Sequence, residues 1–163
     1  MRRISALLSV AAIVLWTVGA HAQAKPDFSG KWVREAPAGG GGGGGGGRGG
    51  GGGFGMENTI KQDAKTLTIE YMGGGQNPAP IKLVFNLDGS ASTNKMMGRG
   101  GEATDQVSKA TWDGAKISIV TSTPNGEVKR VISMEGANMV IESTLPGREG
   151  GAPTTNKAVY KKA

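Results

Sequence analysis

Apolar and polar residues alternate along most of this chain, and short acidic turns interrupt the alternation at intervals. The clearest case is residues 110–119, where Asp113 and Gly114 separate two runs in which every second residue is apolar. The same pattern recurs around Asp63 and Glu135, with a weaker copy around Asp88. Two-residue alternation on both sides of a short turn is typical of a β-hairpin, so the pattern predicts a series of hairpins.

Ten strands are expected, and no segment has a helical period. The predicted hairpins pair residues 57–62 with 66–71, 81–87 with 91–96, 105–112 with 116–122, and 127–134 with 138–145. A first strand that begins near Gly30 and a last strand over 155–161 complete the set. Sequential hairpins without long crossovers favour an all-β, antiparallel up-and-down β-barrel of about 8–10 strands. A β-sandwich is the alternative fold, which contact between the first and last strands would reject.

The first 24 residues have the features of a signal peptide. Two arginines precede a mostly apolar run over residues 4–18, and two small-x-small cleavage sites follow, at Ala22 and Ala24. The apolar run is short for a membrane-spanning helix, and no second one follows it. We therefore expect an exported protein, periplasmic or secreted, in which residues 25–163 form a single domain without a membrane span.

Composition excludes several classes of function. The one histidine, His21, lies in the leader and there is no cysteine, so the mature chain lacks both residue types. This removes Ser–His and Cys–His nucleophiles, the usual zinc ligands and haem ligation by His or Cys. Loss of the two leader arginines lowers the formal charge from +6 to +4, and the charges are interleaved, which argues against a nucleic-acid partner. We expect a non-enzymatic protein without a metal site, and the composition leaves open only enzymes that use carboxylates, Lys or Tyr.

Residues 27–32, Asp-Phe-Ser-Gly-Lys-Trp, resemble the Gly-x-Trp entry to the first strand of lipocalins and related calycin barrels. The chain is also similar to small exported bacterial proteins of unknown function that share a Phe-Ser-Gly-x-Trp opening and Asp-Gly hairpins. The resemblance to lipocalins implies a barrel that binds its ligand non-covalently and without a cofactor, with structural roles for Gly30 and Trp32. The basic partner that the last strand would bring to the tryptophan is Lys157 or Lys161.

Residues 36–55 are rich in glycine, with nine consecutive glycines before Arg48 and five after it. Glycine runs lose much backbone entropy on ordering and have no side chains to bury, so this segment is predicted to be a flexible loop. Arg-Gly tracts can bind RNA, but export and the single arginine in this tract argue against that here.

The predicted barrel has two different ends. The tight turns at Asp63, Asp88, Asp113 and Glu135 lie at one end, and Trp32 and Trp112 are expected to fill the core near it. The longer connections lie at the other end: 36–55, 72–80, 97–104, 123–126 and 146–153. Ligand sites in barrels usually lie at such an open mouth.

The inward face is predicted to be apolar near the tight turns and polar toward the mouth. The inward polar residues are Asn58, Tyr71, Ser108, Thr121, Arg130 and Ser143, and the five arginines of the mature chain lie near the same end: Arg34, Arg48, Arg99, Arg130 and Arg148. Arginine forks match carboxylate and phosphate, so an anionic ligand fits this end. The alternative without a ligand site is that the strand ends are polar because they reach the solvent, and that the loop arginines increase solubility.

These patterns lead to two hypotheses. In the first, the mouth binds a small apolar or amphipathic ligand through residues Tyr71, Thr121, Arg130, Ser143, Arg99 and Arg148. In the second, the protein is a structural or interaction module of the cell envelope with a fully packed core and no ligand.

Overall fold

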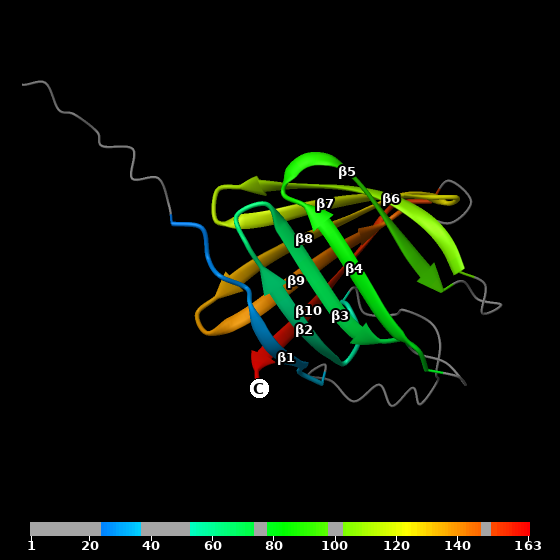
Figure 1. Cartoon of the computed structure of the whole chain (residues 1–163). Helices are drawn as coiled ribbons and strands as arrows, with labels where there is room; N and C mark the ends of the chain where they lie inside the picture. Colours follow the sequence, from blue (N-terminus) through cyan, green and yellow to red (C-terminus); the bar gives the residue numbers. More distant parts are fainter. Residues whose placement is uncertain (1–23, 37–52, 74–77, 98–102, 148–150) are drawn as a thin grey trace, which may run out of the picture.

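The computed structural model describes residues 24–36, 53–73, 78–97, 103–147 and 151–163. Ten strands form one antiparallel sheet that curls into a nearly closed up-and-down barrel (Figure 1). The strands are β1 (Gly30–Arg34), β2 (Glu57–Gln62), β3 (Thr66–Met72), β4 (Pro80–Asn86), β5 (Asp88–Met97), β6 (Ala103–Asp113), β7 (Lys116–Thr123), β8 (Gly126–Glu135), β9 (Asn138–Leu145) and β10 (Thr154–Lys162). Within the described ranges, no helix is long and apolar enough to cross a membrane.

The first and last strands lie side by side, which rejects the β-sandwich. The spatial order of the ten strands is β4-β3-β2-β1-β10-β9-β8-β7-β6-β5. Strand β1 therefore lies between β2 and β10 and joins the β2–β4 part of the sheet to the β5–β10 part. Val33 of β1 pairs with Lys161 of β10, and Trp32 pairs with Asn58 of β2 on the other side. The predicted antiparallel barrel is confirmed.

An acidic side chain stabilises the turn between β2 and β3. Asp63 Oδ1 accepts hydrogen bonds from the backbone N–H groups of Lys65 and Thr66, both at 2.7 Å, and Oδ2 accepts one from Thr66 Oγ1. These bonds hold the pKa of Asp63 below its ordinary value. The turns of the β6–β7 and β8–β9 hairpins contain Gly114 and Gly136 at φ values of 60° and 63°, which favour glycine.

One predicted hairpin is wrong. Strands form at residues 80–86 and 88–97, but β4 and β5 lie at opposite ends of the strand order and share no backbone ladder. A side chain joins them instead: Asn94 Oδ1 accepts from Val84 N at 2.7 Å, and Asn94 Nδ2 donates to Val84 O at 3.0 Å. Nearby, Asn86 Nδ2 donates to Ala91 O at 3.2 Å. We call this junction the β4–β5 seam.

Replacing Asn94 with leucine should weaken the β4–β5 seam. Leucine keeps most of the volume but leaves the N–H and C=O of Val84 without partners, which costs about 1–3 kcal/mol in the free energy of unfolding. Urea denaturation measures this loss, and hydrogen exchange should be faster at the Val84 amide. The matched control is Asn86→Leu, which removes one exposed bond and should cost less. Unchanged exchange at Val84 in Asn94→Leu would contradict the role given to this amide.

Apolar side chains of the inward face fill the barrel, as the alternation predicts. The buried core includes Ile60, Leu67, Ile69, Leu83, Phe85, Leu87, Ala110, Ile117, Ile119, Ile132, Met139 and Ile141, with Trp112 and Met134 packed against it. Two phenylalanines from irregular segments join this core, Phe28 before β1 and Phe54 before β2. Because antiparallel strands alternate in direction, Phe28 lies at the end with the tight turns and Phe54 lies at the mouth.

Around Phe28 the closed end is aromatic. Its carbonyl accepts a hydrogen bond of 2.8 Å from Trp32 Nε1, and its ring stacks on Trp112 with centroids 6.2 Å apart. Trp32 is 1% exposed, and Trp112 is partly buried. Both tryptophans therefore lie where the sequence placed them, at the closed end of the core.

Candidate functional site

Polar side chains from six strands line the mouth half of the barrel. The buried ones are Asn58, Ser108, Thr121 and Ser143, joined by the partly buried Tyr71 and Arg130. Strand register explains their arrangement, because Asn58 pairs with Tyr71, Ser108 with Thr121, and Arg130 with Ser143. The Ser108 and Thr121 hydroxyls are 2.9 Å apart and hydrogen-bonded. These six are the inward polar residues expected from the alternation.

Arg130 is a positively charged group of this site. Its guanidinium carbon lies 5.2 Å from the centroid of the Phe54 ring. Its Nε is a buried donor without a hydrogen-bond partner. The ion pairs among the described residues involve side chains at least a third exposed, and none of them includes Arg130. Burial lowers the pKa of Arg130, while Tyr71 and Tyr160 act in the opposite direction; arginine nevertheless stays charged.

Phe54 covers this arginine. Its ring is 3% exposed and lies 6.1 Å from the ring of Tyr71 and 6.3 Å from the ring of Phe85. A cavity of about 10 Å³ remains beside it, enough for about one water molecule. The residues lining this cavity include Phe54, Asn94, Met96, Ser108, Thr121 and Arg130.

The structure brings together part of the predicted site. Tyr71 and Arg130 both lie next to the Phe54 ring, and Thr121 lines the small cavity beside it. Ser143 is adjacent to Arg130 in register and fully buried. The predicted site residues Arg99 and Arg148, and residues 37–52 of the predicted glycine-rich loop, lie outside the described residues.

Sequence reasoning missed three residues of this site. Phe54 stood in a glycine-rich segment, where a lone aromatic between Gly53 and Gly55 was the available signal. Tyr160 was on the inward parity of the last strand, and its hydroxyl donates a 3.0 Å hydrogen bond to Gly55 O. Asn94 gave the weakest signal, because it lay in a polar run with no alternation to interpret.

No protein-family model matches the chain, and a search of curated proteins finds no significant match.

The basic partner of Trp32 differs from the predicted one. Lys162 Nζ lies 5.6 Å from the centroid of the Trp32 ring, whereas Lys157 pairs with Glu135 and Lys161 with Glu35. The prediction of Lys157 or Lys161 is wrong because Trp32 and Lys162 are opposite each other in the β1–β10 register. Gly30 makes room for this lysine, since a Cβ there would lie 2.9 Å from Lys162 Cε.

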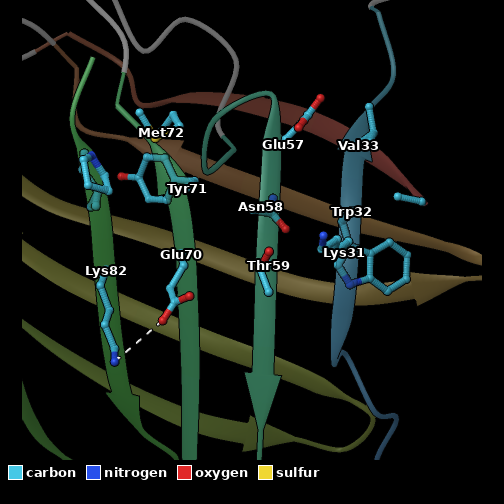
Figure 2. A pocket seen from close by; sticks show the side chains of 13 residues that line it. Lys31, Trp32, Val33, Glu57, Asn58, Thr59, Glu70, Tyr71, Met72 and Lys82 are labelled. Atoms are coloured by element: carbon cyan, nitrogen blue, oxygen red, sulfur yellow. Dashed lines mark ion pairs between the residues drawn. The ribbon is translucent and has the colours of Figure 1, made fainter. Parts of the chain in front are cut away.

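A second hollow lies on the outer face of β1 to β4 (Figure 2). It has a volume of about 710 Å³ and is open to solvent. Its outward side chains include acidic and basic groups. A carboxylate oxygen of Glu70 lies 3.7 Å from Lys82 Nζ (Figure 2), and the other lies 3.8 Å from Lys61 Nζ. Lys31, Glu57 and Lys82 are exposed and Glu70 is ion-paired, so the described lining of the outer groove holds no unpaired charge shielded from water as Arg130 is.

The two tyrosines of the chain, Tyr71 and Tyr160, both border the site, so phenol absorbance reports on it alone. Burial raises the pKa of both phenols. The charge of Arg130 opposes this at Tyr71, and the charge of Arg34 opposes it at Tyr160, both with smaller effects. A folded-state pKa above the unfolded value of about 10 means that stability is unaffected below that pH and falls as pH rises past it.

Absorbance at 295 nm should therefore show the phenols ionising above the ordinary tyrosine range, together with loss of the folded circular dichroism signal. Tyr71→Phe and Tyr160→Phe assign the two steps. Ordinary, reversible ionisation of both tyrosines in the folded protein would contradict their burial.

Proposed function

We propose that this protein is an exported binding protein that holds a small amphipathic anion at the barrel mouth, with Arg130 as the counter-charge. The observation that carries the proposal is the guanidinium inside the barrel, with a buried donor that lacks a partner and no described carboxylate paired to it. A largely desolvated cation that no carboxylate neutralises weakens a fold. An anionic ligand would supply the missing charge and accept the free hydrogen bond.

The surroundings of Arg130 favour an amphipathic ligand over an inorganic anion. The rings of Tyr71 and Phe85 supply apolar surface around the position over the guanidinium that Phe54 now occupies. The Ser108 and Thr121 hydroxyls line the same cavity, and because one donates to the other, one proton is left to donate to an oxygen atom. A carboxylate matches the planar arginine fork, and a short apolar body would pack against the rings.

The likeness to lipocalins agrees with this proposal. The first strand opens with a Gly-x-Trp sequence, Gly30 to Trp32. A basic side chain of the last strand, Lys162, lies over the tryptophan ring. A lipocalin-like barrel would bind the ligand non-covalently and need no cofactor. The alternative is a cell-envelope interaction module with a packed core, which the small size of the cavity beside Arg130 favours.

Ligand binding by the mature chain, residues 25–163, separates these two functions. Isothermal titration with decanoate and with decanol compares one hydrocarbon chain with and without a charge. We expect decanoate to bind more tightly, and Arg130→Met to weaken its binding by at least about 30-fold, since losing one partner of a buried charge pair costs about 2 kcal/mol or more. Lys129→Met is the matched control, because Lys129 is the exposed outward neighbour on the same strand.

Two results would reject the anion site: equal affinity for decanoate and decanol, or unchanged decanoate affinity in Arg130→Met. Absence of binding by either compound would favour the packed-core module.

Export is tested separately, by sequencing the N-terminus of the protein recovered from its own cells. Cleavage after Ala22 or Ala24 is expected. An uncleaved protein in the cytoplasm would contradict this part of the proposal.

A further inference from the structure

The small cavity beside Arg130 raises the question of where a ligand would go. With room for about one water molecule, the site cannot admit an organic anion while Phe54 stays in place. Phe54 is the side chain that lies directly over the guanidinium. A ligand of Arg130 therefore has to replace its ring.

We infer that the Phe54 ring occupies the position of an aromatic carboxylate, and that such a ligand binds by displacing Phe54 from Arg130. This inference rests on the proposed function and narrows its ligand to one chemical class. It also assigns Phe54 a second role, as an internal competitor of the ligand.

The geometry around the Phe54 ring selects an aromatic ligand. Tyr71 and Phe85 lie at interplanar angles of 49° and 47° to it, and Arg130 lies over its face. Tilted ring pairs and cation–π contacts depend on the charge distribution of an aromatic ring. A benzene ring in this position would regain these contacts, whereas an alkyl chain would regain only the apolar burial.

The carboxylate has a defined partner. Arg130 Nε is buried, unpaired and adjacent to the ring position. A carboxylate on the ring would accept hydrogen bonds from the arginine fork, and the Ser108 and Thr121 hydroxyls line the same cavity. The ligand would thus provide both what Phe54 provides, an aromatic ring, and what Phe54 lacks, a negative charge.

Displacement of Phe54 leaves the sheet intact. Phe54 precedes β2 and belongs to no strand, so its departure breaks no ladder. Its neighbours Gly53 and Gly55 have no side chains to hold the segment, and Gly55 has a φ of 68°. The described polar ties are the Asn58 Nδ2 bond to Phe54 O, at 3.3 Å, and the Tyr160 hydroxyl bond to Gly55 O.

The test is benzoate binding to the mature protein and to Phe54→Ala. Removal of the ring should leave a space beside Arg130, and cavities of about 150 Å³ hold benzene in other proteins. Because the wild-type site is available only while Phe54 is displaced, its apparent affinity is reduced by that fraction. We expect Phe54→Ala to bind benzoate at least about tenfold more tightly than the wild type does.

Four controls define the result. Adding Arg130→Met to Phe54→Ala should abolish the gain, and benzyl alcohol and cyclohexanecarboxylate should both bind less tightly than benzoate. Phe28→Ala is the matched variant, because it removes an equally buried ring at the closed end and should bind benzoate no more tightly than the wild type does. If Phe54→Ala does not fold, Phe54→Leu carries the test with a smaller gain, since leucine lacks the aromatic contacts.

The outcomes separate the two proposals. If decanoate binding depends on Arg130 but benzoate binds the Phe54 variants no more tightly than wild type, this inference fails and the proposed function stands. If neither carboxylate binds the wild type or a folded Phe54 variant, both fail.

Discussion

Replacing Trp32 with alanine should lower the free energy of unfolding by about 3–5 kcal/mol, the usual cost of removing a buried tryptophan. Trp32 is 1% exposed. Its Nε1 bonds to Phe28 O, and Lys162 lies over its ring, so one substitution affects the segment before β1 and the end of β10 together. Urea denaturation followed by circular dichroism measures the loss.

Trp112→Ala is the matched control for this prediction. Trp112 is partly exposed and makes its ring contacts with Phe28 and Lys25 at the barrel end. We expect a clearly smaller loss of stability than in Trp32→Ala. Equal losses would show that Trp32 is not the main aromatic support of the closed end.

Replacing Arg130 with methionine should act in the opposite direction and raise the free energy of unfolding by about 1–4 kcal/mol, the range reported for exchanging buried ionic groups for apolar ones. The substitution removes a partly buried cation and its buried, unpaired Nε donor. It also removes the contact with the Phe54 ring, worth about 0.5–2 kcal/mol, which a sulfur–ring contact partly replaces.

The same urea titration tests this second prediction, with Lys129→Met expected to change stability little because Lys129 is exposed. A destabilised Arg130→Met protein would mean that the guanidinium is part of the packing. A gain in stability together with a loss of anion binding is the pattern expected of a residue that serves function at a cost in stability.

Much of this fold follows from the alternation in the sequence, because side chains in a strand point to opposite faces in turn. That rule correctly placed Arg130 and Tyr71 on the inward face and Lys129 on the outward face. The rule could not distinguish the β4–β5 seam from a hairpin, because the same residues of β4 and β5 point into the barrel in both arrangements. The polar run that ends at Asn94 was the only sign that this strand differed.

The remaining differences come from contacts that are distant in sequence. Phe28 and Phe54 lie outside the strands, so no period shows which way their rings point. Lys162 rather than Lys161 reaches Trp32 because of the β1–β10 register, and a shift of one residue changes the face of every side chain. The combination of Phe54 with Arg130 depends on the closed barrel and could not be read from either residue alone.

The most direct test of the Arg130 site is ¹⁵N NMR of its Nε–H group in the mature protein during titration with decanoate. The signal is assigned by its absence in Arg130→Met. Our account predicts that this resonance shifts and saturates with the dissociation constant measured by calorimetry, while the Trp112 Nε1–H resonance at the closed end changes little. An Arg130 resonance that stays in place while decanoate binds would show that the anion binds elsewhere.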